Sequence, residues 1–204
     1  MREYYSGMVH PAAAEIDRLK IVACEIHDTT DESAHSIDGA INMNPAFRHS
    51  HRPSRLLERE LVLDAARRGA LDADFTTSDV GGGLEIVAHS KSCIRTYRLK
   101  RVTRGKTGQY QAVCGAGSSL LQADPESLFR EEKWVLGFVT DDDHTVKSVV
   151  AAEIVGWSGS GPVTLQFGTV IDLTDSQPPR SFTSTDEDLE GFEDEGGAAG
   201  TEAS

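Results

Sequence analysis

The sequence predicts an α+β fold, in which N-terminal helices pack on an antiparallel β-sheet or small β-barrel formed by residues 84–173. Three observations support this class. Apolar residues recur at spacings of three and four up to about residue 70, apolar and polar residues alternate from residue 84 to residue 173, and the last 30 residues are acidic with few apolar side chains. The 204 residues suit one domain, which we divide into a helical part (1–80) and an antiparallel β part (81–174), followed by a tail (175–204).

The first helix is expected over residues 10–27. Pro11 stands where a first helical residue belongs, because its fixed φ suits the first turn and its missing N–H would have no partner there. Residues 28–51 are polar and contain few apolar anchors, so we expect a loop there with at most one short helix. The apolar residues of the first helix stand at helical spacing and are Ile16, Leu19, Val22 and Ile26.

A second helix is expected to begin at Pro53 and to end at Gly69, since glycine often follows the last helical turn. Its apolar side should pack against the rest of the domain. That side is expected to comprise Leu56, Leu57, Leu61 and Ala65, widened by Leu63 and Ala66.

The strands are expected from residue 84 onward, where β-branched residues and alternation replace the helical spacing. Residues 84–89, 94–102 and 109–114 should form consecutive antiparallel strands, the last two joined by a turn at residues 104–108. A short helix is expected over residues 124–132. Three further strands are expected at residues 133–140, 146–157 and 163–173.

The segment after residue 174 is expected to be a disordered acidic tail. It contains two adjacent prolines, Pro178 and Pro179, and seven carboxylates within residues 186–195. With one leucine and two phenylalanines, it cannot bury enough apolar surface to offset the entropy lost on ordering.

Charge is distributed unevenly along the chain, whose formal net charge is −13. Residues 86–123 contain seven Lys and Arg and no Asp or Glu, whereas residues 183–204 contain eight Asp and Glu and no Lys or Arg. The net charge alone would disfavour nucleic acid as a partner. Screening limits electrostatic fields to about 8–10 Å at physiological salt, however, so a ligand meets the local charge and the basic block can attract a polyanion.

The basic block at residues 91–106 is the main candidate site. As a twisted β-hairpin, it could lie along a phosphate backbone and stack an aromatic ring on a base. Strand alternation divides its cations between both faces, so neither face is purely a binding face. The alternative is an edge hairpin whose charges prevent aggregation or pair with acidic residues elsewhere. The candidate polyanion-binding residues of this block are Lys91, Arg95, Tyr97, Arg98, Lys100, Arg101, Arg104 and Lys106.

A second basic cluster precedes the second helix. The free N–H groups and the positive dipole of a helix N-terminus favour an anion there, so the cluster could hold a phosphate. A solvated loop is the simpler alternative. The cluster comprises Arg48, His49, His51, Arg52 and Arg55.

No motif in the sequence assigns catalysis, a metal or a cofactor. Three scattered cysteines form no C-x-x-C pair, and His49 and His51 lack the neighbouring ligands of a zinc site. The turn at residues 141–144 is rich in the oxygen ligands that Mg²⁺ and Ca²⁺ prefer, but an ordinary hairpin tip is the simpler interpretation. We therefore expect no catalytic residue, no metal and no cofactor.

These observations lead to a first hypothesis: a non-catalytic accessory or regulatory protein contacts nucleic acid or another polyanion through the basic hairpin and residues 48–55, and the acidic tail competes for the hairpin. The alternative is a protein–protein adaptor or assembly component whose partner binds the sheet edge or the tail. A second alternative is a small hydrolase or nuclease, for which the sequence supplies no complete set of catalytic groups. No apolar run reaches the ~18 residues of a membrane helix and no signal peptide opens the chain, so we expect a cytoplasmic protein without a membrane partner.

Overall fold

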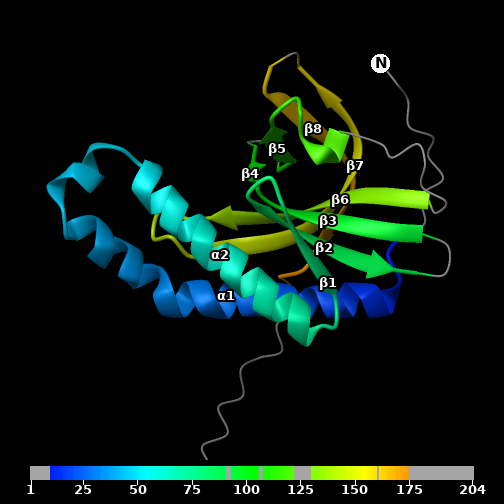
Figure 1. Ribbon diagram of the computed structural model, residues 1–204, viewed down its shortest axis with the longest axis horizontal. Coiled ribbons are helices and arrows are strands. Elements are labelled where there is room, and N and C mark those ends of the chain that lie inside the picture. Colours follow the sequence, from blue (N-terminus) through cyan, green and yellow to red (C-terminus); the bar gives the residue numbers. More distant parts are fainter. Residues whose placement is uncertain (1–9, 91–92, 106–107, 122–129, 160, 175–204) are drawn as a thin grey trace, which may run out of the picture.

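The computed structural model describes residues 10–90, 93–105, 108–121, 130–159 and 161–174 (Figure 1). Two long helices lie against one side of a curved eight-stranded sheet that is mostly antiparallel, which confirms the predicted α+β class. The strand order is β1-β2-β3-β6-β7-β8-β5-β4, so the sheet has two edges and does not close into a barrel.

Helix α1 (Ala13–Asn42) is longer than predicted. Residues 28–42, expected to form a loop, continue the helix because they keep a side that is buried against the sheet. Thr30 shows why their polarity is misleading. Its hydroxyl donates a hydrogen bond to the Ile26 carbonyl at 2.9 Å and accepts one from the Val146 N–H at 3.3 Å, so this polar side chain joins the helix to the sheet.

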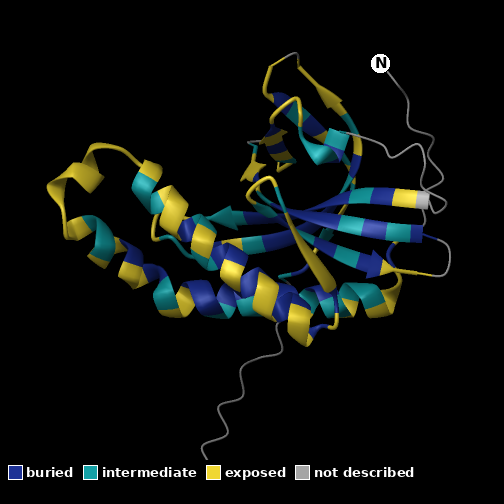
Figure 2. Cartoon of the chain, in the orientation of Figure 1, coloured by how far each residue is buried: buried dark blue, intermediate teal, exposed yellow. Residues whose placement is uncertain are grey.

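A 3-10 helix, η1 (Pro45–His49), leads into α2 (Arg52–Asp72), which confirms the second predicted helix. Its predicted apolar side is partly wrong, because Leu56 and Leu57 are exposed. Both lie in the first turns of α2, near the tip of the helix pair, which is largely exposed in Figure 2. The buried residues of α2 are Glu58, Val62, Leu63, Ala65, Ala66, Gly69 and Ala70.

Gly69 lies inside α2, so the prediction that it ends the helix is wrong. A Cβ atom at this position would come within 2.8 Å of the Val22 Cα on α1. The absence of a side chain at Gly69 therefore allows the two helices to pack closely where they cross.

The strands largely follow the predicted ranges, with one addition. β1 (Thr76–Val80) was not expected, because it is an edge strand of mostly exposed polar residues without alternation. The other elements are β2 (Gly83–His89), β3 (Cys93–Arg101), β4 (Thr103–Arg104), β5 (Tyr110–Cys114), η2 (Ser119–Leu121), β6 (Arg130–Thr140), β7 (Val146–Ser158) and β8 (Val163–Asp172).

Strand β3, which carries most of the basic block, is an inner strand of the sheet. It pairs antiparallel with β2 and parallel with β6, where Tyr97 lies opposite Trp134. The expected pairing of residues 94–102 with residues 109–114 is therefore wrong, because β5 pairs with β8 and only the two residues of β4 pair with β5. Burial of β3 on both faces favours such an inner position over the predicted basic hairpin.

Strand β6 begins at Arg130, so the helix predicted over residues 124–132 is wrong at its last three residues. The remainder of that prediction, at residues 124–129, lies outside the described residues, as does the predicted tail at 175–204. The helices of the described residues all lack the apolar length that a membrane-spanning segment requires.

Apolar residues pack on both faces of the central strands (Figure 2). One cluster lies between the helices and the sheet and includes Tyr97, Leu99 and Trp134. The other contains Val102 and Val135 together with residues of β5, β7 and β8. Each cation on β3 must therefore form an ion pair, be partly buried without one, or lie near the exposed end of the strand. The structure contains all three arrangements.

Candidate anion-binding site

Arg95 and Tyr97 belong to a buried network beneath α1. The side chain of Arg95 is only 3% exposed, and its guanidinium donates to Glu15 Oε2 at 2.6 Å and to Glu132 Oε2 at 2.5 Å. The Tyr97 hydroxyl donates to Glu15 Oε1 at 2.7 Å. These contacts join α1, β3 and β6, so the two predicted site residues stabilise the core and are not accessible to a polyanion.

Burial and the neighbouring charges shift the pKa values of Arg95 and Tyr97. Burial lowers the pKa of the Arg95 guanidinium, but the hydrogen bonds that it donates to Glu15 and Glu132 more than offset this effect, and the net pKa is raised. Burial is also the largest effect on Tyr97, where it raises the pKa, and the neighbouring Glu15 carboxylate raises it further. Arg95 therefore stays charged and Tyr97 stays neutral at physiological pH.

Arg98 stabilises the connection between β1 and β2. Its guanidinium donates to Glu85 Oε1 at 2.9 Å and to the Val80 carbonyl. A Cβ atom on Gly83 would lie 2.9 Å from Arg98 Nη2, so the glycine makes room for the arginine. Arg98 thus has a structural role, although one side of its guanidinium borders a pocket.

The last residues of β3 differ from the first. Arg101 is 39% exposed in its side chain and lies 3.2 Å from Glu58 Oε2 of α2. Lys100 is half-buried, and no hydrogen bond or ion pair joins its ammonium group to another described residue. Burial lowers the pKa of Lys100. The neighbouring Cys114 acts in the opposite direction, and repulsion by Arg98 and Arg59 adds to the lowering.

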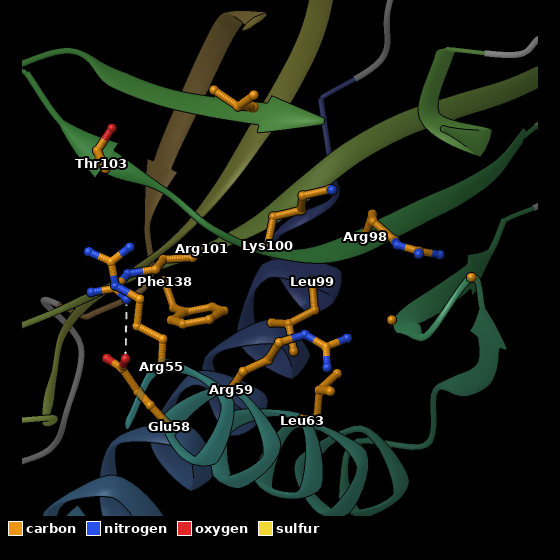
Figure 3. Close-up of a pocket in the computed structure, with 13 residues that line it drawn as sticks. Arg55, Glu58, Arg59, Leu63, Arg98, Leu99, Lys100, Arg101, Thr103 and Phe138 are labelled. Carbon is orange, nitrogen blue, oxygen red and sulfur yellow. Dashed lines mark hydrogen bonds and ion pairs between the residues drawn. The ribbon is translucent and has the colours of Figure 1, made fainter. Parts of the chain in front are cut away.

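These residues line a pocket of about 530 Å³ between α2, β3 and the β1–β2 turn (Figure 3), which we call the cationic pocket. It lies where β2 stops pairing with β3, since Glu85 opposite Arg98 is the last pair of that ladder. Five cations and one carboxylate line it. Its lining residues are Arg55, Glu58, Arg59, Leu63, Gly81, Gly83, Arg98, Leu99, Lys100, Arg101, Thr103, Val113 and Phe138.

The cationic pocket joins the two basic clusters that the sequence shows separately. Arg55 of the second cluster lies beside Arg101 of the first (Figure 3), and both residues line the pocket. The charge of Arg55 is not neutralised within the described part of the chain, because its guanidinium has no hydrogen bond or ion pair with any described residue. Glu58, which pairs with Arg101, is the carboxylate that the pocket contains.

A neighbouring pocket of about 630 Å³ lies between η1, the start of α2 and the turn after β6, and it shares Arg55, Glu58 and Arg101 with the cationic pocket. Arg48 and His51 line it, so they also lie near the first cluster. Its charge is mixed. Opposing carboxylates come from Asp38, Asp141 and Asp142.

The remaining predicted residues lie elsewhere. His49 and Arg52 are exposed and line neither pocket. Arg104 is exposed on β4, where its guanidinium lies 5.6 Å from the centre of the Tyr110 ring. Lys91 and Lys106 lie outside the described residues.

Arg59 and Glu58 were missed by the sequence analysis. The Arg59 guanidinium donates to Glu60 Oε1 at 2.6 Å and to the Gly82 carbonyl, so it holds the β1–β2 turn from the side opposite Arg98. Arg55 and Arg59 are four residues apart in a helix, and this spacing places them on one face. This spacing could have added Arg59 to the candidate residues.

The described residues contain no group of three or more His, Cys, Asp or Glu side chains that could hold a metal ion. Comparison of the chain with protein families, with curated proteins and with solved structures finds no match. The chemistry of the site therefore rests on the arrangement of its own residues.

Proposed function

We propose that this protein is a non-catalytic accessory or regulatory protein that binds nucleic acid or another polyanion, with its main contact in the cationic pocket. The observation that carries the proposal is the convergence of Arg55 and Lys100, from separate basic clusters, in one pocket where neither has a partner among the described residues. Lys100 is half-buried, so it loses hydration, and Arg98 and Arg59 repel its charge. An anion bound in the pocket would offset both costs.

Phosphate groups suit this site better than carboxylates alone. Arginine offers a planar fork of donors that matches phosphate oxygens, and lysine adds a compact positive charge. Arg59 and Arg98 are already held in place by carbonyls of the β1–β2 turn, so the pocket is largely formed before a ligand arrives. Pre-formed donors lower the entropy lost on binding.

The acidic segment at residues 183–204 is proposed to modulate this binding. Its eight carboxylates are tethered to the same chain, which gives them roughly millimolar effective concentration near the domain. Deletion of residues 183–204 should tighten polyanion binding at low salt, with a smaller difference at high salt because screening weakens both contacts. Equal binding by the full-length and truncated proteins at every salt concentration would exclude this competition.

The binding experiment compares the parent protein with the double variant Arg55→Gln/Lys100→Met on single-stranded DNA and RNA, at roughly 50 and 200 mM salt. Losing two phosphate contacts should flatten the logarithmic salt dependence by about 1.5 units. Arg104→Gln is the matched control, because Arg104 belongs to the same basic block but lies outside the pocket.

The expected result is weaker binding by the double variant and unchanged binding by the control. A parent protein that binds neither nucleic acid at the lower salt concentration contradicts the proposal and favours the adaptor hypothesis. Equal losses in the double variant and in Arg104→Gln would also contradict it, because they would indicate binding along the whole basic block.

A further inference from the structure

The end of the helix pair, residues 42–57, which we call the helix tip, exposes apolar and basic side chains together (Figure 2). Of the ten large apolar residues that are exposed in the described part of the chain, four belong to it: Met43, Phe47, Leu56 and Leu57. The sequence from residue 39 to residue 57 contains three arginines and two histidines but no Asp or Glu. Exposed apolar residues that gather beside cations are typical of a binding surface.

The arginines of the helix tip have no carboxylate partner within the described residues. Arg52 and Arg55 form no ion pair there, and the Arg48 guanidinium donates to the neutral Asn42 Oδ1 at 2.8 Å. Arg52 and Leu56 are four residues apart in α2, so a cation and an apolar side chain lie on the same face of the helix. The helix tip therefore suits a partner that has negative charges and apolar side chains close together.

One side of the helix tip is less suitable for such a partner. Phe47 and Arg48 line the neighbouring pocket of about 630 Å³ together with carboxylates of α1 and the turn after β6, which would repel an acidic partner. Arg52, Leu56 and Leu57 do not line that pocket. We therefore expect a partner to bind mainly on their side of the helix tip.

The acidic part of the same chain has the complementary composition. Residues 186–195 contain seven carboxylates, with Leu189 and Phe192 between them. We propose that residues 186–195 bind to the helix tip of the same molecule. Leu189 and Phe192 would contact its apolar side chains, and the carboxylates would lie beside Arg52 and Arg55.

The connection between the two parts is long enough. The described chain ends at Thr174, whose hydroxyl accepts a hydrogen bond from the Val149 N–H at 2.9 Å. From Val149 the path follows β7 to Val146, which contacts Thr30, and then α1 to its end at Asn42. It measures about 10 Å along the strand and about 18 Å along the helix. Residues 175–185 can extend over roughly 36–40 Å, which exceeds this path.

Tethering also explains how contacts at an exposed surface could suffice. Each exposed ion pair is weak, but a flexible connection of this length gives the acidic segment a roughly millimolar effective concentration at the helix tip. The regulatory consequence rests on the proposed function, because Arg55 also lines the cationic pocket. Carboxylates at Arg55 would occupy a cation that the pocket otherwise offers to a polyanion.

The first test locates the acidic segment in the full chain. Phe192→p-benzoylphenylalanine keeps an aromatic side chain and adds a photo-crosslinking group, and peptide mass spectrometry then identifies the residues to which it is joined. Cross-links should fall within residues 42–57 at low salt and decrease at high salt, because screening weakens the ion pairs. Phe182→p-benzoylphenylalanine is the matched control, since Phe182 precedes the acidic cluster and should cross-link there clearly less.

The second test changes the helix tip. In the chain with the photo-crosslinking group at position 192, Phe47→Ser/Leu56→Ser should lower the yield of these cross-links by about tenfold, as expected when the main apolar contacts of an interface are lost. Leu71→Ser is the control, because Leu71 is equally apolar and exposed but lies at the other end of α2. All three side chains are exposed, so each variant should unfold at nearly the same urea concentration as the parent.

The position of the cross-links decides the outcome. Cross-links at residues 98–103 in place of the helix tip, or equal yields in Phe47→Ser/Leu56→Ser and Leu71→Ser, would overturn this inference. Cross-links between two chains, with a yield that rises with protein concentration, would also overturn it, because the segment would then bind a second copy.

Binding of single-stranded DNA distinguishes this inference from the proposed function. At low salt, Phe47→Ser/Leu56→Ser should bind the DNA more tightly than the parent and about as tightly as the protein without residues 183–204. A parent protein that cross-links at the helix tip but binds no polyanion would support the contact and overturn the proposed function. Polyanion binding without cross-links at the helix tip would overturn the contact alone.

Discussion

Arg95 and Lys100 are cations on the same inner strand, β3, yet their surroundings are opposite. Arg95 meets two carboxylates, Glu15 of α1 and Glu132 of β6, and is almost completely buried between them. Lys100 lies past the end of the β2–β3 ladder, has no carboxylate partner among the described residues, and has Cys114, Arg98 and Arg59 as neighbours. The first arrangement stabilises the fold, whereas the second is expected to cost stability, and we propose that it serves to bind an anion.

The difference shows that a basic block in a sequence is not one functional unit. The part of β3 up to Arg98 is neutralised by carboxylates of the same chain, and its cations join elements together. The part after Arg98 shares its surroundings with Arg55 and Arg59 of α2. We therefore expect substitutions at Arg95 and Tyr97 to lower the free energy of unfolding and substitution of Lys100 to raise it. Four predictions test this difference.

The largest effect is expected for Arg95→Met. Removing the guanidinium leaves Glu15 and Glu132 buried without a counter-charge, which typically costs about 3–5 kcal/mol. The free energy of unfolding from urea denaturation should fall by that amount, or the variant should fail to fold. A loss below about 1 kcal/mol would show that the network is not a structural core.

A smaller loss is expected for Tyr97→Phe, which removes the hydrogen bond to Glu15 and should cost about 1.5–3 kcal/mol. Its pH dependence is more informative. The pKa of Tyr97 is raised in the folded protein above its unfolded value of about 10, so the stability that this group contributes is present below that pH and is lost as the pH rises above it.

Urea midpoints measured from pH 8 to pH 11 should therefore fall less steeply above about pH 10 in Tyr97→Phe than in the parent protein. Identical slopes in the two proteins would contradict the raised pKa of the buried hydroxyl.

Lys100→Met should have the opposite sign and raise the free energy of unfolding, by on the order of 0.5 kcal/mol, because it removes a half-buried cation from cationic neighbours. The pKa of Lys100 is lowered in the folded protein, so the unfolded chain binds this proton more tightly. The parent protein should therefore gain stability from this group as the pH rises through the folded pKa toward the unfolded value of about 10.4. Lys100→Met should lack that gain in a series of urea midpoints, and a destabilised Lys100→Met protein would contradict the comparison.

The smallest effect is expected for Arg104→Gln. Arg104 is exposed on β4 and contacts the Tyr110 ring, so its loss should change the free energy of unfolding by no more than about 0.5 kcal/mol. A larger change, measured under the same urea conditions, would show that the basic block stabilises the fold beyond the residues of β3.

Local patterns explain which parts of the fold were predictable. Alternation in residues 146–157 and 163–173 located β7 and β8, because a strand's period is visible within a few residues. The pairing of strands and side chains could not be predicted in this way, because the partners are far apart in the sequence. Arg95 of β3 pairs with Glu132 of β6, 37 residues later, and with Glu15 of α1, 80 residues earlier. Helix α1 was cut short because Thr30, which is polar, satisfies its hydroxyl within the helix and at the sheet.

The candidate site was predictable in composition but not in arrangement. Both basic clusters were identified, and Arg55, Lys100 and Arg101 were among their residues. Their proximity depends on how α2 crosses the end of β3, which no local pattern reveals. The same crossing buries Glu58 beside Arg101, and a single glutamate on a helix is ordinarily a solvated residue.

The most direct test of the central claim, that the end of β3 holds an anion, is stabilisation by inorganic pyrophosphate. Urea unfolding of the parent protein and of Lys100→Met would be measured with and without pyrophosphate at low ionic strength. The parent should gain about 2.7 kcal/mol when pyrophosphate reaches roughly 100 times its dissociation constant, and Lys100→Met should gain clearly less at the same concentration. No gain in the parent, or equal gains in both proteins, would contradict the account.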